Sequence, residues 1–171
     1  MGTHSFTVKR LEQSPEISKS PQVVLAFQKE SVRLSQSVAA AEKIFAEFEN
    51  RVAHLKVALT RTASDIEPLE QQIGVIESSL DEVKVKLLGD RSVTSRGKAA
   101  AWPVKRRVGA LFWHWNSQFD VPGTYKHSLD IAQQEYESIR SDLETIAEAL
   151  DALESDADAI GVPWTPGRTI R

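Results

Sequence analysis

The chain has 171 residues, of which 41% are hydrophobic and 26% charged, and its formal net charge is −3. This balance is typical of a globular domain, and the length suffices for one domain whose core needs no metal or crosslink. The chain has no cysteine, which excludes disulfides and zinc–thiolate sites, and no apolar run approaches the roughly 18 residues that predict a membrane span.

The first long amphipathic stretch covers about residues 21–62. Its apolar residues alternate at intervals of three and four, which is the heptad pattern of a helix that buries one narrow seam. The seam comprises Val24, Phe27, Leu34, Val38, Ala41, Phe45, Phe48, Val52, Leu55 and Leu59. Ser31 is its only polar member, and Ser20 followed by Pro21 is a typical helix start.

A second stretch, over about 65–88, has the same spacing. Its seam comprises Ile66, Leu69, Ile73, Ile76, Leu80, Val83 and Leu87. Ser64 and Glu67 have the spacing of a capping box at its start, and Gly89 is a typical helix end.

The junction between these stretches leaves two interpretations open. The first seam continues through Thr62 into the second without a change of phase, so one bent helix over 21–88 is possible. A cluster of residues that interrupt helices favours a hairpin instead. This cluster comprises Thr60, Thr62, Ser64, Asp65 and Pro68.

The last long stretch covers about 124–160. Its seam comprises Leu129, Ala132, Tyr136, Ile139, Leu143, Ile146, Leu150, Leu153, Ala157 and Ile160. Thr124 can cap its start, and Gly161 and Pro163 stop it. Three such seams cover one another best in an antiparallel bundle.

The pattern changes between these long stretches. Residues 89–100 are predicted to form a loop, and a short helix over about 102–117 follows. The second stretch and this short helix together match the first stretch in length. We therefore expect an all-α, elongated antiparallel bundle of three limbs and four helices, with the middle limb interrupted by the loop. A separate fourth antiparallel helix is the alternative.

The two ends of the chain differ from the bundle, which we expect to cover residues 20–161. Phe6 and Val8 alternate with polar residues, which is the pattern of a half-buried strand. Residues 1–19 are therefore interpreted as a residual strand and linker from a preceding β-domain. Residues 162–171 are expected to form an extended tail, with Trp164 on the end of the bundle.

We expect no catalytic residue, metal site or cofactor, and no enzymatic activity in this chain. The four histidines have no metal-ligand spacing. Glu154, Asp156 and Asp158 resemble part of a calcium loop, but Ile160 occupies a ligand position, so a solvated acidic helix face is expected.

Charge divides the chain unevenly. Residues 124–160 hold ten acidic and two basic side chains, whereas residues 89–110 hold six basic and one acidic side chain. One interpretation is that the basic segment pairs with the acidic limbs inside the bundle. A second is a partner-binding surface formed by Lys105, Arg106, Arg107, Trp113 and Trp115.

Three short motifs are Trp102-Pro103-Val104-Lys105, Pro122-Gly123-Thr124 and the run from Gly161 to Arg168. Together they resemble the C-terminal helical region of sortilin-like bacterial β-propeller proteins with BNR (Asp-box) repeats, which are often labelled glycosyl hydrolases. In that family a β-sandwich-like segment precedes the helices, and residues 6–9 occupy its place here. The resemblance implies an exported or envelope-associated parent protein. It transfers no active-site residue, because the propeller lies outside this chain.

These observations predict a non-catalytic helical accessory domain, the C-terminal spacer or docking module of such a propeller protein. Its partner would be a protein or the parent propeller, and the acidic bundle disfavours nucleic acid. The alternative is an oligomerising coiled coil that uses the 21–88 seam, or a membrane-surface adaptor that uses the basic and aromatic residues of 102–119.

Overall fold

The computed structural model describes residues 5, 7, 20–63, 65–90, 93, 95–96, 100–114 and 120–168. Four α-helices are labelled α1 (Pro21–Leu59), α2 (Glu67–Leu88), α4 (Val104–Leu111) and α5 (Gly123–Ala159). A 3-10 turn, Phe112–His114, continues α4. No strand occurs among the described residues, and the all-α prediction is confirmed.

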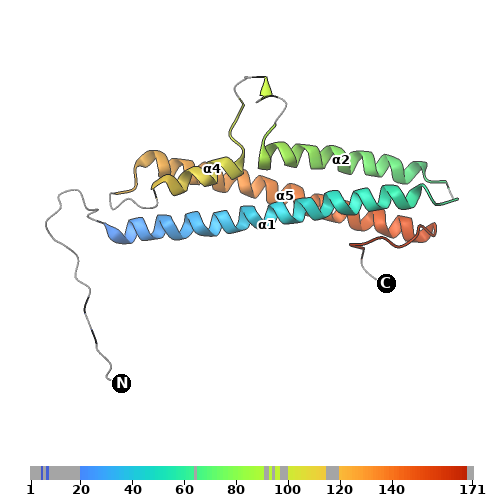
Figure 1. The fold of residues 1–171 in the computed structure, drawn as a ribbon, viewed down its shortest axis with the longest axis horizontal. Coiled ribbons are helices and arrows are strands. Elements are labelled where there is room, and N and C mark those ends of the chain that lie inside the picture. Colours follow the sequence, from blue (N-terminus) through green and yellow to red (C-terminus); the bar gives the residue numbers. More distant parts are fainter. Residues whose placement is uncertain are drawn as a thin grey trace.

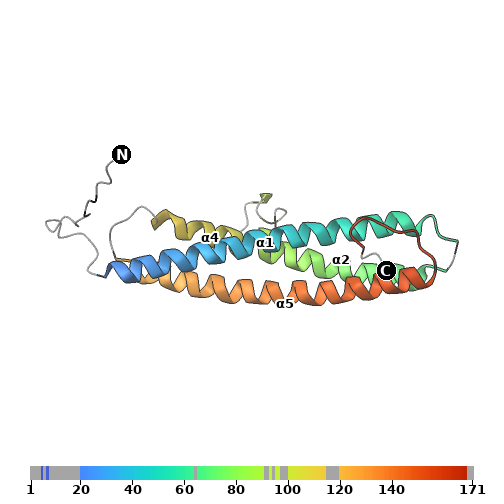
Figure 2. The same cartoon turned by 90° about the horizontal axis from the view of Figure 1, so that it is seen from below.

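The helices form three limbs that lie side by side (Figures 1 and 2). α1 and α5 are two of the limbs, and α2 followed by α4 forms the third. α2 runs antiparallel to α1 and packs against it, so the hairpin is confirmed and the single helix over 21–88 is wrong. α4 follows α2 along the same side of the rod and continues in its direction (Figure 1), which confirms the interrupted middle limb.

Threonine side chains explain why α1 ends at Leu59 and not at residue 62. The Thr60 hydroxyl donates to the Val57 carbonyl at 2.7 Å, and the Thr62 hydroxyl donates to the Ala58 carbonyl at 3.2 Å. The helix therefore ends with side-chain donors on its last carbonyls, and the Ala58 carbonyl also accepts from the Arg61 N–H at 3.1 Å. The start of α2 is held by Asp65, whose Oδ1 accepts from the Glu67 N–H at 3.1 Å. Ser64, expected in this role, lies outside the described residues.

The remaining helix ends also differ from expectation by a few residues. Pro103, with ψ of 154°, is extended, so α4 begins at Val104 and not at residue 102. α5 begins one residue before Thr124, and the Pro122 carbonyl accepts from the N–H groups of Tyr125 and Lys126. Thr124 is therefore inside the first helical turn and is not the cap.

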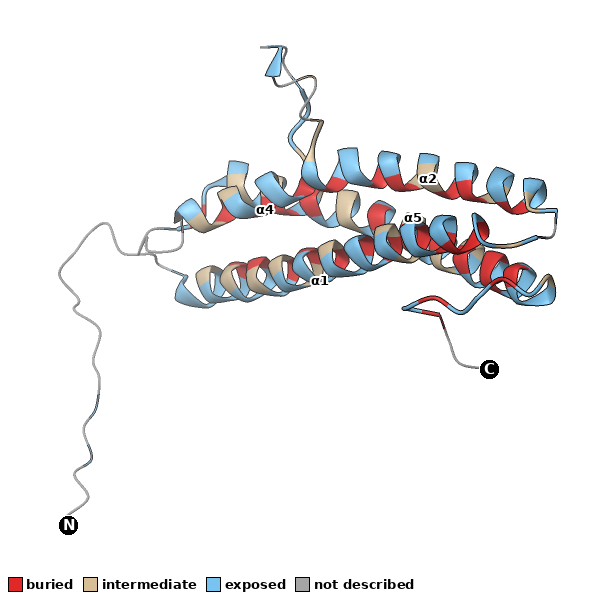
Figure 3. Cartoon of the chain, turned by 45° about the vertical axis from the view of Figure 1, so that its right-hand side comes forward, coloured by how far each residue is buried: buried red, intermediate tan, exposed pale blue. Residues whose placement is uncertain are grey.

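The core is one continuous apolar column along the rod. Figure 3 shows the buried faces of the helices turned toward one another, with the exposed faces outward. The predicted seams supply it: every seam member is buried except Val24, Ile66, Tyr136 and Ile160, which are half-buried. The seam over 21–88 is thus covered within the chain, by α5 and α4.

Ser31 interrupts this column with a fully buried hydroxyl that has no hydrogen-bond partner among the described residues. An unpaired buried hydroxyl costs about 1–3 kcal/mol, and alanine is the better helix former. We expect Ser31→Ala to raise the free energy of unfolding by about 1 kcal/mol, measured by urea denaturation. A lower free energy of unfolding for Ser31→Ala would show that the hydroxyl is paired in solution.

The structure describes the C-terminal tail but almost none of the N-terminal segment. The strand and linker predicted for 1–19 lie outside the described residues, apart from residues 5 and 7. The tail doubles back beside α1 (Figure 2), where Val162, Thr165 and Arg168 are buried. Trp164, expected on the end of the bundle, is 59% exposed, so the tail is anchored by its other residues.

Candidate functional site

α4 carries most of the residues predicted to bind a partner. Val104, Val108 and Leu111 face the core and are at most 3% exposed. Because these three residues fix the rotation of the helix, the side chains between them point sideways or outward. The three consecutive basic residues of α4 therefore have three different surroundings.

Lys105 and Arg107 point sideways and pair with the neighbouring limbs. Lys105 Nζ lies 2.5 Å from Glu42 Oε1 on α1. Arg107 donates from Nε and Nη2 to the two carboxylate oxygens of Glu135 on α5, at 2.9 and 3.1 Å. This geometry supports internal pairing for these two residues.

Arg106 points outward and lies over the ring of Trp102, with 4.4 Å between its Cζ and the ring centroid. It has no carboxylate partner among the described residues. An arginine stacked on tryptophan keeps the hydrogen-bonding edge of its guanidinium open to solvent. Arg106 is therefore the one base of this trio whose donors are left for a ligand.

Trp113 also points outward and is 76% exposed. It lies in the 3-10 turn after α4 and lines a pocket with Tyr125 and Ser128 of α5. Arg106 and Gly109 lie on the side of α4 that faces away from the core, and Trp102, which precedes the helix, stacks under Arg106. We call these four residues the α4 outer face. Trp115, also predicted to bind, lies outside the described residues.

The exposure of Trp113 predicts that it contributes little to stability. We expect Trp113→Ala to change the free energy of unfolding by less than about 0.5 kcal/mol. Its buried neighbour Leu111 is the comparison, because Leu111→Ala should cost about 2–5 kcal/mol. Equal losses in thermal denaturation would mean that Trp113 packs on the bundle in solution.

A groove opens beside Trp102, where α2 ends and α4 begins. Most of the groove is lined by apolar side chains from the end of α2 to the start of α4, and two residues of α5 complete it. Its lining comprises Val85, Lys86, Asp90, Val93, Ala100, Ala101, Trp102, Pro103, Val104, Glu135 and Ser138. We call it the junction groove.

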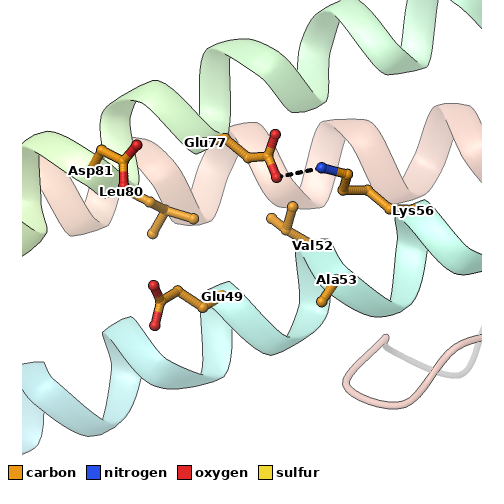
Figure 4. Close-up of a pocket in the computed structure, with 7 residues that line it drawn as sticks. All are labelled: Glu49, Val52, Ala53, Lys56, Glu77, Leu80 and Asp81. Carbon is orange, nitrogen blue, oxygen red and sulfur yellow. Dashed lines mark hydrogen bonds and ion pairs between the residues drawn. The ribbon is translucent and has the colours of Figure 1, made fainter.

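A second groove lies between α1 and α2, and Figure 4 shows its lining. Lys56 Nζ lies 2.7 Å from Glu77 Oε1, and Lys84 Nζ lies 2.9 Å from Glu49 Oε1. These carboxylates therefore join the two helices across their seam, over a floor that includes Val52 and Leu80. Such pairs are worth about 0–1 kcal/mol each, but they select which helix faces align.

The densest charge cluster lies at the other end of the rod from α4, under the tail. Arg51 donates to Glu154 Oε1 at 2.9 Å and to Asp151 Oδ1 at 3.0 Å. Burial lowers the pKa of Arg51, but its hydrogen bonds to Asp151 and Glu154 outweigh this effect and the pKa is raised. Glu154 is only 4% exposed, so its predicted place on a solvated acidic face is wrong.

The tail completes this cluster. The Arg168 guanidinium donates to the carbonyls of Glu154 and Pro163 at 3.1 and 3.2 Å and pairs with Asp158. Gly167 has φ of +93°, and a Cβ there would lie 2.8 Å from Arg51 Cγ, so only glycine lets the tail approach α1 this closely. Sequence reasoning missed this approach of the tail to α1, because Gly167 and Arg51 are far apart in the chain.

Neither cluster gathers three or more residues able to hold a metal ion, within the described part of the chain. Each helix that the structure describes is too short or too polar to span a bilayer. No family model, curated protein or solved structure matches the chain.

Proposed function

We propose that this chain is a non-catalytic helical spacer and docking module. The observation that carries the proposal is the α4 outer face. Lys105 and Arg107 hold α4 in the bundle through ion pairs, whereas Arg106 stacks on the partly exposed Trp102 and Trp113 is 76% exposed. Exposed tryptophan and arginine are the residues most often found at the centre of protein interfaces.

The spacer part of the proposal is supported by the shape of the rod. α1 and α5 have 39 and 37 residues and run along the whole bundle. At 1.5 Å per residue each is about 55–60 Å long. A continuous core and the Arg51 cluster hold the limbs together, so structures attached at opposite ends would be kept apart at that distance.

We further propose that the module belongs to a BNR-repeat propeller protein, on the resemblance described above. Its support is where the resembling residues lie. Pro103 precedes α4, Pro122 precedes α5, and Gly161 turns the tail back onto the rod. The test is the reading frame upstream of Met1: a propeller-coding stretch in frame supports this assignment, and its absence overturns it.

Docking can be tested before the partner is identified. A benzophenone amino acid placed at position 113 should crosslink to a distinct protein in the host cell. The same group at position 54, on the exposed side of α1, is the matched control. We expect a product from position 113 that position 54 does not yield. Identical products, or none from position 113, would contradict docking through α4.

A membrane-surface adaptor is the second candidate, and the stacked Trp102 and Arg106 favour it. Aromatic and basic residues together on one helix face are typical of interfacial helices. Sedimentation with vesicles of phosphatidylglycerol at low salt would support this candidate, provided that Trp113→Ala abolishes it. Protein in the supernatant would exclude it.

A further inference from the structure

The segment between α2 and α4 is an insertion that leaves the heptad phase of the middle limb unchanged. Across from α1, Glu49 pairs with Lys84, and Glu42 is one heptad earlier. An uninterrupted α2 would therefore place residue 91 opposite Glu42. The residue found there is Lys105, which lies two heptads further along the chain.

The ion pairs with α5 show the same offset of two heptads in the sequence. Lys86 pairs with Asp142, and Glu135 is one heptad earlier on α5. An uninterrupted α2 would place residue 93 opposite Glu135. The residue found there is Arg107, again two heptads further along. The contacts of both α1 and α5 therefore fit a single helix formed by α2 and α4, with an insertion of two heptads between them.

The seam and the backbone agree with this interpretation. When residues 90–103 are left out of the count, Val104 and Val108 follow Val83 and Leu87 at the same three-and-four spacing. The ends of the insertion meet, because a Cβ on Gly89 would lie 3.2 Å from Pro103 Cγ. The bundle core therefore does not require residues 90–103.

The described residues of the insertion add a surface at the junction of α2 and α4. They supply the apolar side of the junction groove and Trp102, the platform on which Arg106 lies. The segment 89–110 has six basic residues against one acidic residue. In the described part of this segment, the bases that form an ion pair with another limb are Lys105 and Arg107. Arg106, which lies on Trp102 at the edge of the groove, has no carboxylate partner among the described residues.

We propose that the junction groove and the Trp102–Arg106 pair bind an acidic peptide segment of a protein partner. A carboxylate of the peptide would accept two hydrogen bonds from the open edge of Arg106. An apolar side chain next to it would enter the groove. This inference rests on the proposed docking function and names the chemistry of the partner.

A second copy of this chain is a poorer occupant. The acidic residues of α5 are the obvious complement to Arg106, but most are already paired within the chain. Their partners are Arg107 for Glu135, Lys86 for Asp142, Arg51 for Asp151 and Glu154, Arg140 for Glu137 and Glu144, and Arg168 for Asp158. Dimerisation through them would break existing ion pairs.

The probe is an array of short peptides, each with one leucine, valine, isoleucine or phenylalanine among glutamates. A matched array carries glutamine in place of every glutamate. We expect glutamate peptides to bind at least tenfold more tightly in fluorescence anisotropy. Arg106→Gln should remove this preference, and Lys43→Gln, which removes an exposed cation on α1, should leave it unchanged. Equal binding of the two arrays, or equal effects of the two substitutions, would overturn the proposal.

A second variant separates the site from the fold. Excision of residues 90–103 with Gly89→Ala should join α2 to α4 as one helix, with a melting temperature at least as high as that of the intact chain. Binding of the glutamate peptides should be lost. A lower melting temperature would contradict the claim that the core does not require residues 90–103. Unchanged peptide binding by the excised chain would contradict the proposed binding site. Crosslinking from position 113 with no glutamate-peptide binding would reject the acidic partner but leave the docking function standing.

Discussion

Replacement of Phe45 by alanine is expected to lower the free energy of unfolding by about 3–5 kcal/mol. Phe45 is 3% exposed at the middle of α1, where it packs into the column shared by the three limbs. The loss combines the transfer of the ring to water with the cavity that the rigid limbs cannot close. Chemical denaturation followed by circular dichroism in the far ultraviolet measures it.

Val57→Ala is the matched control for this experiment. Val57 lies on the same helix but is 55% exposed. Its truncation should change the free energy of unfolding by less than about 0.5 kcal/mol. If Phe45→Ala cost less than about 1 kcal/mol, the seam of α1 would not be the core of the protein.

Arg51→Ala is expected to lower the free energy of unfolding by about 2–4 kcal/mol. It leaves the Glu154 carboxylate, which is almost fully buried, without its cation. Removal of one member of a buried pair costs about 3–5 kcal/mol, and the partial exposure of Asp151 and Arg51 reduces this figure. Arg51 also supports Gly167, so the tail should loosen in the same variant.

Two comparisons make the Arg51 prediction specific. Arg140 pairs with Glu137 and Glu144 on the exposed side of α5, and Arg140→Ala should have a far smaller effect. Replacement of both members of the buried pair, as Arg51→Met with Glu154→Leu, should recover most of the lost stability. Equal losses for Arg51→Ala and Arg140→Ala in urea denaturation would contradict a buried cluster under the tail.

The limbs could be predicted from the sequence because each seam repeats the same spacing over many turns. The limb lengths also indicated that α4 completes α2, since neither alone covers α1. The helix ends were harder to place, because they depend on single hydrogen bonds. Thr60 and Thr62 end α1 through their hydroxyls, and Pro103 begins α4 later than the apolar pattern does.

The surroundings of the predicted binding residues depend on the rotation of α4. From the sequence, Lys105, Arg106 and Arg107 form one basic group, although they flank the seam at different heptad positions. Their rotation about α4 separates two pairing residues from one outward residue. The spacing to Val104 and Val108 contained this information.

The Arg168 contact with α5 had no such local signal. It exists because Gly161 takes φ of +76° and turns the chain back, so that a residue further along the tail reaches Glu154 and Asp158. Periodicity reports which side of a helix is buried, but not where an irregular tail comes to rest. Contacts of this kind therefore become visible only in the three-dimensional structure.

Native-state hydrogen exchange of α4 tests the central claim, that α4 completes the middle limb of one bundle. An eight-residue helix is not stable alone in water, so protection of its amides must come from packing. We predict that the Val108 and Leu111 amides exchange as slowly as those of Val83 and Leu87, through opening of the whole bundle. Fast exchange of α4 while α2 stays protected would contradict the account.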